Sequence, residues 1–129
     1  MKRVFLSFMV EDRQTVNGIR LLASNPRHPI EFYDESVTTP YNSNNADYIK
    51  QQIREKINRT SVTVCISSRN THTSQWVNWE LEISMNKGNT IILMAIQGLT
   101  QVTLPASVRE HTCWTWDMAY LTRLIEEAQ

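Results

Sequence analysis

The stretch SQWVNWELEISMNKGN, residues 74–89, places two tryptophans and two glutamates within seven residues. In the helix that this stretch predicts, residues four positions apart share a face, so Trp76 and Glu80 are neighbours. A carboxylate beside an indole ring is partly shielded from water, which strengthens its attraction for a positive charge that develops during a reaction. The pair therefore indicates electrostatic catalysis on a substrate that becomes cationic.

The same helix allows a purely structural interpretation. Trp76 can anchor the helix to the core, and Glu80 can be a solvated or paired surface acid. The face with Val77, Leu81 and Ser84 is expected to pack on a sheet, whereas Trp79 and Glu82 are expected at the rim or on the surface. Spacing alone leaves both interpretations open.

Short apolar runs alternate with helical patterns along the chain, which is typical of a parallel sheet covered by helices on both faces. We expect one domain over residues 1–129 with the fold of a flavodoxin-like α/β three-layer sandwich containing a five-stranded parallel sheet. The expected strands are residues 3–8, 30–34, 61–67, 90–96 and 113–116. The expected helices are residues 11–24, a segment capped by Asn45 with Ile49, Ile53 and Ile57 in its core row, residues 74–86, and residues 117–128, with one further turn after Pro105.

In such sheets, ligands bind at the carboxyl ends of the strands, where the strand order reverses. Polar or pocket-forming residues stand at three of these ends, namely Ser7, Phe8 and Met9, then Asp34 and Ser36, then Ser67 and Ser68. The third strand ends in serine rather than the carboxylate that a response-regulator receiver needs. The three glycines of the chain form no phosphate-binding GxGxxG or GKS/T motif.

Composition excludes several classes of function. Thirteen basic residues balance thirteen acidic ones, so we expect no nucleic-acid partner. No run approaches the roughly 20 apolar residues of a membrane span, and we expect a soluble cytoplasmic protein with no membrane association. Cys65 and Cys113 stand in apolar runs and are expected to be buried, reduced thiols. The histidines and cysteines lack the spacing of metal ligands, so no metal is expected.

Five segments together resemble the TIR domain family, and within it the prokaryotic TIR-like proteins of Thoeris antiphage systems. These segments are RVFLSF, FYD, SVTVCISS, SQWVNWELE and KGNTIILMAI, and they span about Arg3 to Ile96 in the expected order. Two features differ from many TIR domains. Phe8 stands where many have tyrosine, and the loop after Asp34 lacks the Arg-Asp and Pro-Gly pattern of animal receptors.

The resemblance implies roles for particular residues. Glu80 matches the catalytic glutamate of the W-x-x-x-E helix, which cleaves the N-glycosidic bond of NAD, and Trp76 matches its tryptophan. It also implies that the substrate is bound by residues at the strand ends, with Phe8 and Met9 in the pocket wall and Ser67 near the ribose. The expected substrate-binding set is Ser7, Phe8, Met9, Asp34, Ser36, Ser67 and Trp76.

The chemistry is compatible with a single acid. Most glycosidases need two carboxylates, because an alkoxide leaves poorly unless it is protonated. Nicotinamide instead departs from a cationic pyridinium as a neutral molecule, so one anionic Glu80 can orient the ribose and stabilise the oxocarbenium-like ring. NAD is then the substrate and no cofactor is needed. Capture of the cation by water gives ADP-ribose, and capture by the same molecule gives a cyclic product.

Two classes of function remain at this point. The first is a NAD-cleaving enzyme, an NAD nucleosidase or ADP-ribosyl cyclase, that assembles into a homo-oligomer on activation and signals to a separate effector protein through its nucleotide product. The second is a non-catalytic TIR-like module that acts by homotypic interaction. A nucleoside hydrolase or deoxyribosyltransferase is a third alternative, because these enzymes share the fold and a glycosidic carboxylate.

Overall fold

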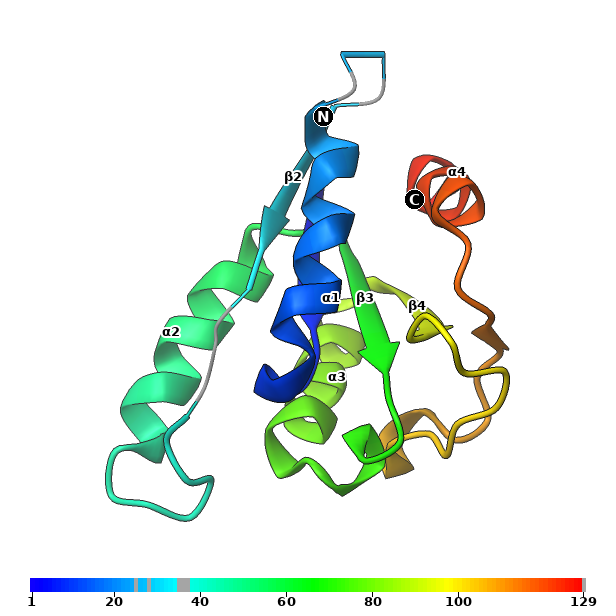
Figure 1. Cartoon of the computed structure of the whole chain (residues 1–129). Helices are drawn as coiled ribbons and strands as arrows, with labels where there is room; N and C mark the ends of the chain where they lie inside the picture. Colours follow the sequence, from blue (N-terminus) through cyan, green and yellow to red (C-terminus); the bar gives the residue numbers. More distant parts are fainter. Residues whose placement is uncertain (25, 28, 35–37, 129) are drawn as a thin grey trace.

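A central parallel sheet organises the chain in the computed structural model, which describes residues 1–24, 26–27, 29–34 and 38–128 (Figure 1). In these residues the sheet has five strands in the order β2-β1-β3-β4-β5. The chain passes from β1 to β2 at one edge of the sheet, crosses back to β3 on the other side of β1, and continues to β4 and β5. The strand order therefore reverses between β1 and β3. The bounds are Lys2–Ser7 for β1, Ile30–Tyr33 for β2, Val62–Ser67 for β3, Thr90–Ala95 for β4 and Cys113–Trp114 for β5.

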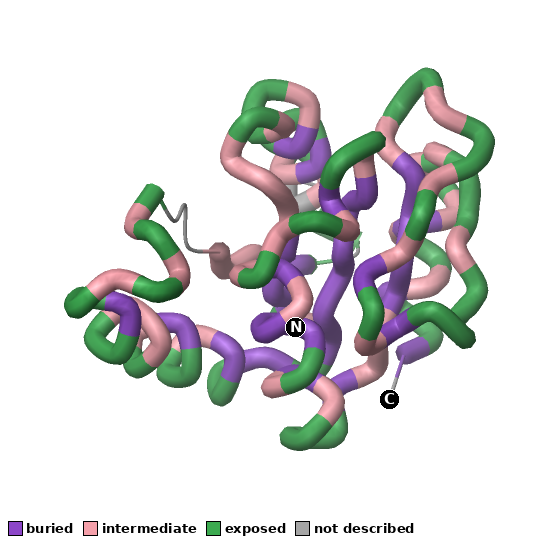
Figure 2. Tube along the Cα trace, turned by 90° about the horizontal axis from the view of Figure 1, so that it is seen from below, coloured by how far each residue is buried: buried purple, intermediate pink, exposed green. Residues whose placement is uncertain are grey.

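The central strands consist mainly of apolar residues because helices cover both of their faces. All six residues of β3 are buried, and Figure 2 shows buried segments gathered along the middle of the molecule. Alternate side chains point to opposite faces, so Val4 and Leu6 of β1 enter one core, whereas Phe5 enters the other. Ser7 lies two residues after Phe5 and therefore points to the same face of the sheet. Its hydroxyl faces the layer that contains α3, Gln75–Lys87.

One face of the sheet is covered by the first helical segment and by α4, Met118–Glu127. Val16 and Ile19 from the former, with Leu121 and Ile125 from α4, bury apolar surface against the strands. The first segment consists of η1 Val10–Asp12, α1 Arg13–Asn17 and η2 Gly18–Ser24. The sequence predicted one continuous helix over residues 11–24, which is wrong in this detail. Gly18, a poor helix former, stands where the α-helical turns give way to the second 3-10 segment.

The other face is covered by α2, Ala46–Asn58, and by α3, with the short turns η3 Thr71–Thr73 and η4 Ala106–Val108 beside α3. Ile53 and Ile57 of α2 are buried in the core, as the spacing of the isoleucines predicted, and they pack with Phe5 and Trp79; Ile49 of the same row is only partly buried. The expected position of Trp79 at the rim or on the surface is wrong, because the residue is only 8% exposed. The tryptophan fills the space between the two helices, a contact that the pattern of one helix cannot reveal.

The ends of the elements follow their capping residues. Val77 N donates to Ser74 Oγ at 3.1 Å, so Ser74 caps α3 at its N-terminus. Gly88 ends α3 with φ of 93°, as predicted for a left-handed C-cap. Asn45 precedes α2 but makes no side-chain capping hydrogen bond. Cys113 was expected to be buried and is only half-buried, because β5 is a two-residue strand at the edge of the sheet.

Gly88→Ala should destabilise the domain by about 1–2 kcal/mol, because a Cβ is disfavoured in the left-handed conformation. The matched control is Gly18→Ala, where φ is −60° and, among the described residues, no atom beyond the chain neighbours and the local helix backbone lies within 4 Å of an added Cβ. The control should be neutral or stabilising by roughly 0.4–1 kcal/mol. Urea unfolding of both variants measures the difference, and equal stabilities would contradict it.

Candidate functional site

Glu80 lies on the face of α3 that packs against the sheet. It is 3% exposed and shares that face with Val77, Leu81 and Ser84, all of which are buried. Ser7 Oγ, at the carboxyl end of β1, donates a hydrogen bond to Glu80 Oε1 at 2.6 Å. Burial of a carboxylate is costly unless polar groups satisfy it, and this short charge-assisted bond supplies part of that compensation.

A small cavity of about 90 Å³ opens beside this carboxylate. Its walls come from the segment that follows β1 and from the first two turns of α3 with its cap. They are formed by Phe8, Met9, Val10, Glu11, Ser74, Trp76 and Glu80. The structure thus brings together four of the residues predicted for the site, Phe8, Met9, Trp76 and Glu80, with Ser7 bonded directly to the carboxylate.

Trp76 lines the cavity and also holds the segment after β2. Its Nε1 donates to the carbonyl oxygen of Thr39 at 2.7 Å. Its ring makes edge-to-face contacts with Tyr41 and Trp79, with centroids 5.1 and 6.1 Å apart. Both sequence interpretations of Trp76 therefore have a basis in the geometry, since the ring anchors α3 and also borders the space where a substrate ring could lie.

Two other predicted residues, Asp34 and Ser67, lie outside the walls of this cavity. Asp34 is paired with Arg20, and Lys56 Nζ donates to the carbonyl oxygen of Asp34 at 2.8 Å. Ser67 is fully buried, with its Oγ 3.7 Å from the sulfur of Cys65. Ser36 lies outside the described residues. Their predicted contacts with the substrate stay predictions.

The thiol of Cys65 lies in the same layer as Glu80. Burial, with a smaller contribution from the nearby negative charge of Glu80, raises the pKa of Cys65 to about 12. The hydrogen bond with Ser67 opposes this shift. Cys65 is thus a protonated thiol at neutral pH and cannot act as a nucleophile. Glu80 reaches the cavity from this layer, and Glu11 and Ser74 also form part of the cavity wall.

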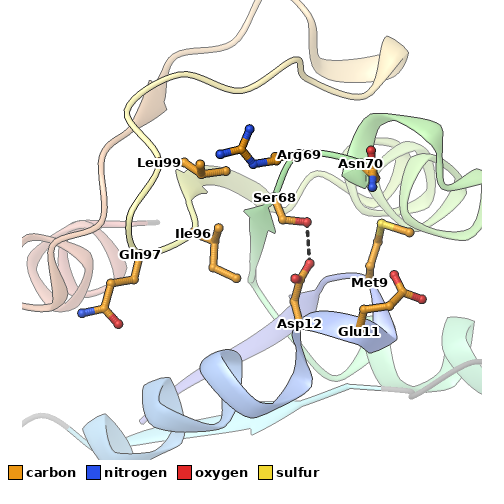
Figure 3. Close-up of a pocket in the computed structure, with 9 residues that line it drawn as sticks. All are labelled: Met9, Glu11, Asp12, Ser68, Arg69, Asn70, Ile96, Gln97 and Leu99. Atoms are coloured by element: carbon orange, nitrogen blue, oxygen red, sulfur yellow. Dashed lines mark hydrogen bonds between the residues drawn. The ribbon is translucent and has the colours of Figure 1, made fainter.

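A larger cavity of about 370 Å³ adjoins the first, and Figure 3 shows the residues around it. Met9 and Glu11 line both cavities. The remaining walls come from the segments that follow β1, β3 and β4, namely Asp12, Ser68, Arg69, Asn70, Ile96, Gln97 and Leu99. Apart from Met9 and Ser68, which stand at the ends of the first and third expected strands, sequence reasoning placed none of these residues in a binding site. Their position just beyond strand ends was the available signal, because these ends meet at one edge of a parallel sheet.

Two further features concern metal ions and membranes. Among the described residues, no three or more histidine, cysteine, aspartate or glutamate side chains are grouped so that they could hold a metal ion. No helix in the described ranges has both the length and the apolar composition needed to cross a bilayer.

Comparisons with known proteins agree with the observed fold. The family model described as "Thoeris protein ThsB, TIR-like domain" matches residues 5–101. Among solved structures, the chain is similar to the TIR domain of the Toll-related receptor TRR-2 from Hydra magnipapillata, with a TM-score of 0.67 and 18% sequence identity. The match covers 96% of this chain and 98% of the receptor domain, and at this identity it shows the fold alone. No curated protein sequence matches the chain.

Ser7→Ala should lower the free energy of unfolding by about 1–3 kcal/mol, because it removes a donor from a buried carboxylate. Urea unfolding measures the loss. In a Glu80→Gln background the same substitution should cost less, because a neutral amide oxygen is a weaker acceptor. Equal losses in the two backgrounds would show that Ser7 and Glu80 are not energetically coupled.

Trp76→Phe should keep part of the ring packing and lose the hydrogen bond to Thr39, at a cost of about 0.5–1.5 kcal/mol. Amide hydrogen exchange should become faster at Thr39 and Tyr41, on either side of Pro40. Trp114→Phe is the matched control, because Trp114 lies at the edge of the sheet and is 37% exposed. Unchanged exchange in Trp76→Phe would contradict the anchoring role.

Proposed function

Because the chain belongs to the TIR-like domain family of the Thoeris protein ThsB, we propose that it is an enzyme that cleaves the bond between nicotinamide and ribose in NAD. One observation carries this proposal. Glu80, the glutamate of the W-x-x-x-E helix, is buried on the packing face of α3 and still lines a cavity at the switch point of the sheet. A carboxylate on a packing face is costly, which favours a role beyond folding.

In the proposed reaction, the C1′–N bond of the nicotinamide riboside breaks and its electron pair passes to the pyridinium nitrogen. Nicotinamide leaves as a neutral molecule, and positive charge develops on the ribose ring. Glu80 stabilises this charge in a site from which most water is excluded, where electrostatic interactions are stronger than in bulk solvent. Ser7, which donates to Oε1, holds the carboxylate in position.

The second half of the reaction determines the product. Attack by water at C1′ gives ADP-ribose and releases a proton. Attack by a ring nitrogen or a ribose hydroxyl of the same molecule gives a cyclic ADP-ribose isomer, with a proton lost when the attacking group is a hydroxyl. We propose the cyclic product, because a bound substrate that fills a cavity of about 90 Å³ leaves little space for water to attack C1′.

The family membership links the chain to Thoeris antiphage defence. We propose that the reaction takes place in the cytoplasm, that copies of the chain associate when they are activated, and that the nucleotide product acts on a separate effector protein. Trp76 offers a route by which association could control the cavity. It borders the cavity and bonds to Thr39, so a contact that moves the segment after β2 also moves a cavity wall.

Glu80→Gln should reduce nicotinamide release from NAD by at least about 100-fold, because the amide cannot neutralise the developing positive charge. Mass spectrometry of NAD incubated with the purified protein at several protein concentrations measures nicotinamide and the nucleotide product together. Glu82→Gln is the matched control, because Glu82 is exposed on the same helix and accepts a hydrogen bond from Asn78. It should retain full activity.

Two outcomes would contradict this assignment. Unchanged turnover in Glu80→Gln would reject Glu80 as the catalytic residue. A wild-type chain that leaves NAD intact at every concentration, including in the associated state, would favour the non-catalytic interaction module.

A further inference from the structure

The larger cavity of about 370 Å³ adjoins the small cavity beside Glu80 (the Glu80 cavity) and differs from it in volume and in lining residues. Met9 and Glu11 form a common border between the two spaces. At about 370 Å³, the larger cavity is within the range of roughly 300–1,000 Å³ that is usual for small-molecule sites, whereas the Glu80 cavity is well below it. A dinucleotide that places its reacting ribose at Glu80 therefore needs adjoining space for its remaining half, and this cavity supplies it.

The charges around the larger cavity are separated along its length. Figure 3 shows the carboxylate of Glu11 beside Met9, at the border with the Glu80 cavity, and the guanidinium of Arg69 at the far side, next to Leu99. In the part of the chain that the structure describes, Arg69 is exposed and makes no ion pair or hydrogen bond. An arginine with free donors is suited to bidentate contacts with phosphate oxygens.

The middle of the cavity offers groups for a sugar and a base. Ser68 Oγ donates to Asp12 Oδ2 at 2.6 Å, and the remaining acceptor positions of this carboxylate can bind sugar hydroxyls. Ile96 and Leu99 provide apolar surface for the face of a ring. The cavity thus combines a cation, hydrogen-bond acceptors and an apolar wall.

We propose that this cavity binds the adenosine diphosphate half of NAD, with Arg69 at the diphosphate and the Asp12–Ser68 pair at a ribose. This inference rests on the proposed function of the neighbouring site. The polarity matches the substrate, because the cationic nicotinamide riboside lies toward the carboxylates Glu80 and Glu11, and the anionic diphosphate lies toward Arg69. The opposite orientation of NAD would place its diphosphate against the carboxylates of Glu80 and Glu11.

The test is binding of ADP-ribose to the whole chain, measured by calorimetry and mapped by amide chemical shifts. The wild type should bind it with shifts at residues 68–70 and 96–99. Arg69→Glu should weaken binding by roughly 10- to 100-fold, as expected for loss of a charge-assisted hydrogen bond. Arg109→Glu is the matched control, because Arg109 is exposed and lines neither cavity. Adenosine, which lacks the diphosphate, should bind both variants equally.

The possible outcomes separate this inference from the proposed function. Equal ADP-ribose affinity in Arg69→Glu and Arg109→Glu, or shifts confined to other residues, would overturn the assignment of the cavity. Cleavage of NAD by a chain that does not bind ADP-ribose would also overturn the assignment of the cavity, but it would support the proposed enzymatic function. Binding at residues 68–70 and 96–99 by a chain that does not cleave NAD would support the cavity assignment and count against the proposed function.

Discussion

The hydrogen bond from Ser7 to Glu80 joins the end of a central strand to the packing face of a helix, and the candidate site depends on it. A helix position that faces a sheet usually carries an aliphatic side chain, because burial of a charged carboxylate opposes folding. The bond at 2.6 Å lets the carboxylate remain in the layer between α3 and the sheet. The same bond keeps it at the floor of the cavity, where a substrate cation would be close.

Further polar contacts between α3 and the sheet hold the helix in register at its other end. Thr63 Oγ1 donates to Ser84 Oγ at 2.7 Å, and the side-chain amide of Asn89 donates to Thr63 Oγ1 at 3.2 Å. Apolar packing flanks these bonds on both sides, around Leu81 and around Trp79. Directional hydrogen bonds specify one position of the helix, whereas apolar contacts tolerate small shifts, so the polar contacts determine where Glu80 lies.

The two cavities follow from the topology of the sheet. The strand order reverses between β1 and β3, so the segments after these strands diverge and leave space between them. α3 closes one part of this space and contributes Glu80, and the segment after β4 borders the other part. A catalytic group and a larger binding surface can therefore lie side by side in a domain of 129 residues.

The sequence by itself determined the layered α/β fold, because apolar periodicity, Ser74 and Gly88 are local signals that specify elements and their ends. It also singled out Glu80 and Trp76, because their spacing and the W-x-x-x-E pattern are visible in one helix. Only the tertiary structure decided that Trp79 is buried, that Asp34 pairs with Arg20, and that Arg69 borders a cavity with Leu99. These facts depend on contacts between residues far apart in the chain, and a local pattern carries no information about which distant side chain fills a given space.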